Sequence, residues 1–216
     1  MLKANGIHKS YGTLQVLKGV DLEILTSEIV SIVGSSGAGK STLLHILGTL
    51  DQPDRGSLEM DGKKLLNLKG DELAKFRNER IGFIFQFHNL LPEFTAQENI
   101  MIPGLIGKTP PEKLAKKSGE LAELLGISHR LDHKPSTLSG GEQQRVAVAR
   151  ALINSPAVVF ADEPSGNLDT QNAKGLHELF FTLRKELGQA FVIVTHNEEL
   201  AEMADRKVVM QDGLIL

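Results

Sequence analysis

Short apolar runs along the chain predict strands, and their pattern separates two kinds of sheet. Residues 157–161 and 190–194 are continuously apolar and bounded by polar or turn residues, which is typical of strands buried on both faces of a parallel sheet. The runs 29–33 and 81–85 have the same length. The second half of 14–24 instead alternates between apolar and polar residues, as in a strand with one buried face.

Helix signals dominate the middle of the chain. Thr95 and Glu98 have the spacing of a capping box, Thr109–Glu112 opens a further helix that closes at Gly126, and Ser139 is predicted to cap a third. Two more helices are expected at 71–80 and 170–187, and Asp61-Gly62 predicts a hairpin turn between strands 57–60 and 63–66. The order of the elements predicts an α/β fold with a helical insert and an N-terminal antiparallel β part.

Composition narrows the class of protein. The 216 residues are 41% hydrophobic and 24% charged, which suits a single folded domain over 1–216. A net charge of -3 gives no general attraction to nucleic acid, so we expect no nucleic-acid partner. The chain has no cysteine, no apolar leader and no apolar run of membrane-spanning length. We therefore expect a cytoplasmic protein whose membrane role, if any, depends on a partner.

A glycine-rich segment lies between the run 29–33 and a helix-like stretch. It consists of Gly34, Ser35, Ser36, Gly37, Ala38, Gly39, Lys40 and Ser41, followed by Thr42. The pattern G-x-x-x-x-G-K-[ST] in this context is typical of a phosphate-binding loop, because the glycines let backbone N–H groups turn toward the phosphates. Lys40 would add a positive charge and Ser41 a hydroxyl ligand for Mg2+. The segment predicts a nucleoside triphosphate site.

Two adjacent carboxylates follow the run 157–161. Such a pair is usually a solvated acidic turn, but after a buried strand in a chain with a phosphate-binding loop it suits two chemical tasks. Asp162 would hold Mg2+, and Glu163 would act as the general base that polarises the attacking water.

Taken in order, these motifs resemble the ATP-binding cassette family over essentially the whole chain. The loop 34–41 matches its Walker A motif, 138–145 its signature and 158–163 its Walker B motif, with Gln86 and His196 at the Q-loop and switch positions. The resemblance implies a RecA-like P-loop NTPase core over 1–86 and 157–216, and a helical subdomain over 87–156. Glu142 stands where many cassettes carry Gln, which we expect to matter little.

The resemblance also implies roles for single residues. Gln86 would sense Mg2+ and the γ-phosphate, and His196 would sense the γ-phosphate and position the water. Tyr11 would stack on adenine, although a strand-edge tyrosine is the plainer alternative. Ser139, Gly140 and Gly141 would leave a helix N-terminus bare for the ATP of a second chain. Catalysis would then require a head-to-tail homodimer with two shared ATP sites.

Several stretches resemble one branch of the family, the lipoprotein-releasing LolD group with its MacB and FtsE relatives. These are 81–86, 95–99, 165–169 and 190–196. The resemblance implies an ATPase that drives separate integral membrane permease subunits from the inner face of the cell membrane, with ATP and Mg2+ as cofactors. Lipoprotein release is the first expectation, and an FtsE-like regulatory cassette in cell division is the alternative.

Large apolar residues follow Gln86 closely, and they have two explanations. Phe87, Leu90, Leu91 and Phe94 form either a groove for a short helix of the membrane partner or the core of the helical insert. The remaining histidines show no metal-ligand spacing and are interpreted as ordinary surface or core residues, with His45 packing on the helix after the phosphate-binding loop. They are His8, His45, His88, His129, His133 and His177.

Overall fold

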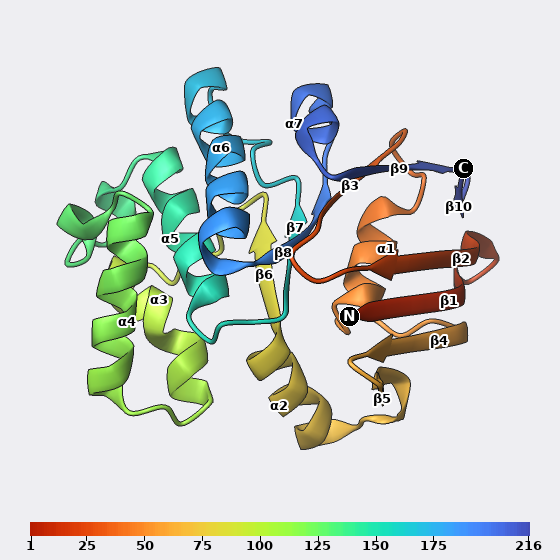
Figure 1. The fold of residues 1–216 in the computed structure, drawn as a ribbon, viewed down its shortest axis with the longest axis horizontal. Coiled ribbons are helices and arrows are strands. Elements are labelled where there is room, and N and C mark those ends of the chain that lie inside the picture. Colours follow the sequence, from red (N-terminus) through yellow and green to blue (C-terminus); the bar gives the residue numbers. More distant parts are fainter.

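The computed structural model describes all residues 1–216 and contains two sheets (Figure 1). The larger has six strands in the order β10, β9, β3, β8, β7, β6. Their bounds are Leu214–Ile215, Arg206–Gln211, Ile29–Val33, Ala190–Val194, Val158–Asp162 and Ile81–Phe85. The five strands from β9 to β6 are parallel, and β10 folds back antiparallel on β9. The smaller sheet is antiparallel in the order β2, β1, β4, β5, with bounds Leu14–Ile24, Leu2–Tyr11, Arg55–Met60 and Lys63–Lys64.

The helices divide between the two sides of the larger sheet. Their bounds are Lys40–Leu47 (α1), Gly70–Arg80 (α2), Ala96–Ile106 (α3), Pro111–Leu124 (α4), Gly140–Leu152 (α5), Thr170–Leu187 (α6) and Glu198–Met203 (α7), with short 3-10 helices at Leu65–Asn67, Ser128–Arg130 and Pro135–Thr137. In Figure 1, α3, α4 and α5 gather on one side, whereas α1 lies beside the smaller sheet on the other. No helix is both long and apolar enough to cross a membrane.

The larger sheet is buried on both faces because each central strand contributes to two hydrophobic cores. In β8, Val192 and Val194 face a core shared with α1 and the smaller sheet, while Phe191 and Ile193 face a core shared with α3 to α6. Strand β7 divides in the same way, with Phe160 on the first side and Val159 on the second. Side chains alternate along a strand, so a continuous apolar run is what a strand between two cores requires.

The predicted α/β fold with an N-terminal antiparallel β part is confirmed, and so are most of the predicted elements. The runs 81–85 and 190–194 are strands, Thr95 and Ser139 cap α3 and α5, and α2 buries no residue. The prediction of a strand over 63–66 was wrong in length, because β5 ends at Lys64 and a 3-10 turn begins at Leu65. The sequence interpretation did not include α7, β9 or β10. The division into a core and a helical subdomain stays a prediction.

Candidate functional site

The glycine-rich loop connects β3 to α1 and needs glycine at two points. Gly34 has φ 150°, and a Cβ there would lie 2.1 Å from the carbonyl oxygen of Met210. Gly39, the residue before α1, is left-handed with φ 97°. Both conformations strongly favour glycine. The Lys40 ammonium is nearly buried and donates to the carbonyl oxygens of Gly34 and Ser35, each at 2.9 Å. The loop therefore surrounds the Lys40 ammonium, the cation that would contact the phosphates.

Ser41 and Asp162 meet across the sheet, as a shared Mg2+ role would require. The Ser41 hydroxyl donates to Asp162 Oδ1 at 3.0 Å, although 121 positions separate them. The other carboxylate oxygen, Oδ2, lies 3.8 Å from His45 Nε2. The interpretation of His45 as a packing residue was incomplete, because the side chain is 39% exposed and faces this carboxylate. One hydroxyl and one carboxylate are hard oxygen ligands that suit Mg2+, whose remaining positions are usually filled by water and substrate phosphates.

Glu163 and His196 form a second pair at the ends of β7 and β8. His196 Nε2 lies 3.0 Å from Glu163 Oε1, and the backbone N–H of His196 donates to Oε2 at 3.2 Å. Although the ring is close enough for an ion pair, Oε1 has no hydrogen-bond donor. Burial raises the pKa of Glu163, while the nearby His196 lowers it. A carboxylate with one oxygen held by a backbone N–H, beside a histidine ring, suits general-base chemistry.

Glu163 also has an unusual backbone. Its φ is 46°, a left-handed value that is uncommon outside glycine, and its N–H donates to Val194 O at 2.9 Å. The carbonyl of Glu163 accepts from the N–H of Gly166 at 3.0 Å. Strained backbone held by surrounding bonds is frequent at functional sites.

Gln86 does not approach Ser41 and Asp162 but pairs with the loop after Glu163. Its Nε2 donates to Asn167 Oδ1 at 3.1 Å, and Asn167 Nδ2 donates to the carbonyl oxygen of Gln86 at 3.1 Å. Two residues before Asn167 in the same loop, Ser165 Oγ lies 3.1 Å from Nε2 of the buried His177. His177, interpreted from sequence as an ordinary residue, thus anchors a loop of the site.

Tyr11 lies at the end of β1, where its ring is 52% exposed. Its hydroxyl donates to Asp51 Oδ2 at 2.6 Å, and this bond raises the pKa of the phenol. Lys9 donates to the same carboxylate at 2.8 Å. An exposed aromatic face held by its hydroxyl end fits a stacking platform for a planar base.

One cavity of about 420 Å³ collects most of the predicted nucleotide residues. Those lining it are Tyr11, Ser36, Gly37, Gly39, Lys40, Ser41, Thr42, Glu163 and His196. A neighbouring cavity of about 670 Å³ shares Glu163 and His196 with it and is lined by Gln86 and the loop after Glu163. The signature residues Ser139, Gly140 and Gly141 line neither cavity, so one chain does not bring them to its own phosphate-binding loop.

The sequence suggested a bare helix N-terminus at Ser139, but in the structure this terminus is partly capped. Ser139 Oγ accepts from the N–H of Glu142 at 3.3 Å, and the N–H of Ser139 donates to Glu142 Oε2 at 2.8 Å. The backbone N–H groups of Gly140 and Gly141 remain as donors for an anion, because the first residues of a helix have no intrahelical acceptor.

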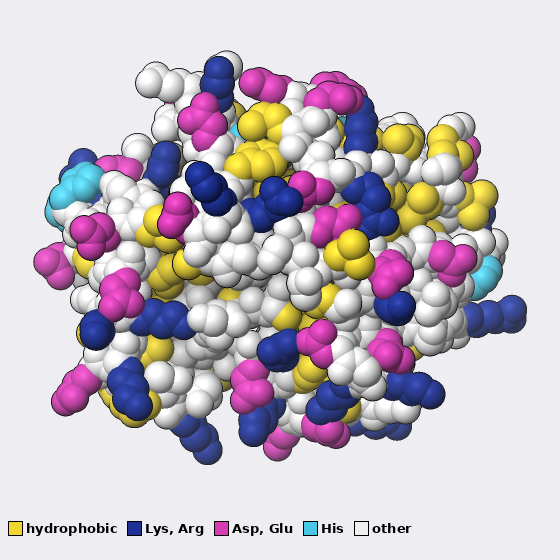
Figure 2. All heavy atoms as spheres, viewed as in Figure 1, with side chains coloured by type: hydrophobic (Ala, Val, Ile, Leu, Met, Phe, Trp, Pro, Cys, Tyr) yellow, Lys and Arg dark blue, Asp and Glu magenta, His cyan; other side chains and the backbone are white.

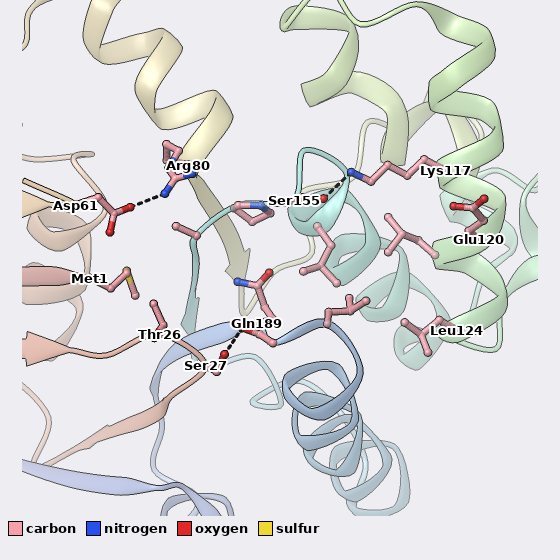
Figure 3. Close-up of a pocket in the computed structure, with 16 residues that line it drawn as sticks. Met1, Thr26, Ser27, Asp61, Arg80, Lys117, Glu120, Leu124, Ser155 and Gln189 are labelled. Atoms are coloured by element: carbon pink, nitrogen blue, oxygen red, sulfur yellow. Dashed lines mark hydrogen bonds and ion pairs between the residues drawn. The ribbon is translucent and has the colours of Figure 1, made fainter. Parts of the chain in front are cut away.

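A further cavity of about 500 Å³ lies at the other end of the parallel strands from the nucleotide cavity (Figure 3). None of the predicted site residues lines it. Its cations already have partners, since Arg80 pairs with Asp61 at 2.5 Å and Lys117 donates to Ser155 Oγ at 2.7 Å. No glycine-rich loop borders this cavity, so the 420 Å³ cavity is the better phosphate site.

The apolar residues after Gln86 divide between the two expected roles. Phe87 is 70% exposed, and Leu91 and Phe94 are also exposed, whereas Leu90 packs against the core under α3 to α6. Buried Asn99 shapes this loop, because its side chain bonds to the backbone of Leu91, Phe94 and Thr95. Beside the loop runs a groove of about 460 Å³ lined in part by Phe83, Phe85, Pro103, Ile106 and Arg150.

Sequence reasoning missed the residues that support the site from a distance. Asp51 and His177 belong to no pattern that marks chemistry, and Asn167 was given no role of its own although it lies in the stretch 165–169 that resembles the family. Their partners Tyr11, Ser165 and Gln86 lie 40, 12 and 81 positions away in the chain. A weak signal existed for Asn167, which stands four residues after the strand-end carboxylate Glu163 in a loop rich in turn formers.

Comparisons with known proteins agree with this geometry. A family model described as ABC transporter matches residues 17–166. The chain is 60% identical to the lipoprotein-releasing system ATP-binding protein LolD of Cytophaga hutchinsonii, covering 100% of this chain and 99% of that protein. It is 58% identical to the protein of the same name from Bacteroides fragilis over 100% of both. A dimeric ATP-binding cassette solved in a post-hydrolysis state with ADP and Pi is similar in structure, with TM-score 0.90, 40% identity and coverage of 100% and 96%.

Proposed function

Because the chain belongs to the ABC transporter family, we propose that its ATPase activity drives a separate membrane protein in the release of lipoproteins from the membrane. The observation that carries this proposal is the full-length similarity to LolD proteins, together with a cavity that joins the phosphate-binding loop to Glu163 and His196. The same similarity favours lipoprotein release over the regulatory cell-division alternative.

ATP binds in the 420 Å³ cavity. The adenine stacks on Tyr11, which Asp51 holds in place, and the phosphates accept from the loop backbone and from Lys40. Lys40 exchanges its two carbonyl partners for phosphate oxygens. Mg2+, when bound with ATP, neutralises the charge that develops on the phosphates, and Ser41 and Asp162 are the residues that would hold it.

Hydrolysis needs a base in line with the γ-phosphate. The Glu163 carboxylate accepts the proton of the attacking water, while the backbone N–H of His196 holds Oε2. The His196 ring, 3.0 Å from Oε1, orients the carboxylate and lies close enough to the cavity to contact the γ-phosphate. The pKa of Glu163, raised by burial, favours proton acceptance.

The complete site needs two chains. The N–H groups of Gly140 and Gly141 are the unused donors of α5, and neither residue lines the cavity of its own chain. We therefore place them against the γ-phosphate of a second copy in a head-to-tail dimer, as the dimeric form of the similar cassette supports.

The membrane partner docks at the groove beside the Gln86 loop. Ile106, which lines the groove, is 69% exposed, and Phe87 in the adjoining loop is 70% exposed. Such exposure of large apolar side chains is typical of surfaces that a partner covers. We propose that the chain, docked on this partner, works at the inner face of the membrane.

One substitution tests the proposed chemistry. Glu163→Gln keeps the shape of the side chain but removes the base, so we expect ATP binding to persist while hydrolysis falls by roughly a hundredfold or more. Binding is measured by equilibrium titration and turnover by phosphate production. Glu199→Gln, a nearby exposed carboxylate, is the matched control. Turnover near that of the unaltered chain in Glu163→Gln would remove Glu163 from the mechanism.

A further inference from the structure

The Gln86 side chain is bound by another loop of its own chain, and the proposed ATP reaction does not require this contact. Its side chain lines the 670 Å³ cavity beside the nucleotide cavity, and its Nε2 donates a hydrogen bond to Asn167 Oδ1 at 3.1 Å. Asn167 Nδ2 donates in return to the backbone carbonyl oxygen of Gln86, also at 3.1 Å. Both ends of the Asn167 amide are therefore engaged, and the Gln86 side chain is held by one hydrogen bond.

A second observation, independent of the hydrogen bonds, points to the same place. A Cβ on Gly166 would lie 3.0 Å from Gln86 Nε2 and 3.2 Å from its Cδ. The backbone of Gly166 is not left-handed, so its conformation alone would accept alanine. Glycine at this position therefore makes room for the Gln86 side chain rather than for a turn.

The loop that carries Gly166 and Asn167 is itself held firmly. Ser165 Oγ lies 3.1 Å from His177 Nε2, Gly166 N–H donates to Glu163 O, and Asp169 caps α6 by accepting from Asn172 N–H at 2.9 Å. The loop thus connects the base Glu163 to the place where Gln86 rests. Gly166 and Asn167 together are called the Gln86 cradle below.

We propose that the Gln86 cradle holds Gln86 away from the nucleotide cavity, and that Mg2+–ATP recruits Gln86 only by displacing it from Asn167. Asn167 is then a positioning residue, and the cradle is an autoinhibitory contact. It sets how much of the binding free energy of Mg2+–ATP is used to move the Gln86 loop, which borders the groove for the membrane partner. This inference rests on the proposed function.

The test compares binding of a non-hydrolysable ATP analogue with Mg2+ and with EDTA, using monomeric protein. Asn167→Ala removes the amide partner, and Gly166→Ala displaces the Gln86 side chain. In both variants the Kd with Mg2+ should fall about two- to tenfold, the range that one net hydrogen bond gives, because Gln86 no longer has to leave its cradle. The Kd in EDTA should stay unchanged.

Two matched controls separate this effect from general perturbation. Gln171→Ala changes a neighbouring exposed amide that makes no side-chain hydrogen bond, and Gly119→Ala adds a Cβ that meets nothing within 4 Å. Both should bind the analogue as the unaltered chain does. Thermal unfolding midpoints verify that all four variants are folded.

A double-mutant cycle tests whether the cradle acts through Gln86. In a Gln86→Ala background, Asn167→Ala should add no further change in the Kd with Mg2+. The inference is overturned if a cradle variant changes the Kd with Mg2+ and the Kd in EDTA by the same factor, because such a change is a general structural effect. It is also overturned if neither cradle variant differs from its control. An unaltered chain that binds no analogue would instead overturn the proposed function, and with it this inference.

Discussion

At the residue scale, the signature glycines differ in what surrounds them. A Cβ on Gly141 would lie 2.6 Å from Asn172 Oδ1, and Asn172 Nδ2 in turn donates to Asp169 Oδ2 at 2.6 Å. A Cβ on Gly140 would meet only Leu168 Cδ2 at 3.7 Å, an ordinary contact. A substitution of Gly141 would therefore disturb the structure of its own chain. A substitution of Gly140 would not, so Gly140 is the better position for testing the dimeric site.

Gly140→Asp should place a carboxylate where the partner chain's γ-phosphate binds. We expect hydrolysis to fall by roughly a hundredfold, comparable to the loss of one transition-state donor, while the monomer keeps its own ATP affinity. Gly140→Ala is the milder control, and ATP titration of monomeric protein is the decisive measurement. If the Gly140→Asp monomer no longer binds ATP, the glycine serves its own chain and the two-chain site is wrong.

At the element scale, α5 depends on its N-terminal cap. Glu142 receives the N–H of Ser139, and Arg130 Nε donates to Glu142 Oε1 at 2.6 Å. The Ser139 N–H, followed by Arg130, lowers the pKa of Glu142 to about 2. The sequence-based expectation that Glu at this position matters little left out this structural role, because Arg130 belongs to a separate 3-10 turn.

The lowered pKa of Glu142 determines how the stability of the protein changes with pH. Glu142 contributes stability above its ordinary pKa of 4.5, and the contribution is lost as pH falls from there toward about 2. Glu142→Ala should lower the free energy of unfolding at pH 7 by about 1 kcal/mol, the usual value of a cap, since solvent screens the ion pair. Urea unfolding across this pH range measures it. Glu123→Ala, an exposed residue of α4, should show no such pH-dependent difference; a constant difference at every pH would exclude the charge as its cause.

At the scale of the whole molecule, the region after Gln86 joins the nucleotide site to an exposed groove. The sequence left open whether its apolar residues form a core or a docking surface. In the structure Leu90 is partly buried and packs against the core, whereas Phe87 is exposed. Phe87 and Leu90 therefore provide a matched pair of positions for substitution, one exposed and one packed against the core.

Phe87→Glu should weaken co-purification with the membrane partner by at least about tenfold, while the isolated chain keeps its unfolding midpoint. Leu90→Glu should instead destabilise the chain by roughly 2 to 4 kcal/mol, because it places a charge against an apolar core. Thermal unfolding and pull-down of both variants separate the two effects. Undiminished partner binding by folded Phe87→Glu would move the docking surface elsewhere.

Charged side chains of both signs lie on one face of the molecule. On the face in Figure 2, Lys and Arg are interspersed with Asp and Glu. Nucleic-acid binders usually show a basic stripe or patch, and the expectation of no nucleic-acid partner stays a prediction.

Local patterns made the strands, the phosphate-binding loop and the caps predictable, because a cap or a buried strand is specified by residues within a few positions. The supporting contacts were not predictable in this way. Gln86 and Asn167 lie 81 positions apart, and Tyr11 and Asp51 lie 40 apart. His45 faces Asp162 only because α1 packs beside β7, which the periodicity of α1 does not reveal. The two-residue strand β10 is too short for any period to show.

The position of β3 in the larger sheet has a consequence for synthesis on the ribosome. Strand β3 is made early, yet both of its neighbours, β8 and β9, come from residues 190–211. A nascent chain that has not passed residue 190 therefore carries a phosphate-binding strand with two unpaired edges and open apolar faces. Such long-range pairing is slow and exposes aggregation-prone surface. Translation must be almost complete before this protein can acquire its ATP site, so a chaperone that shields the early strands would raise its yield.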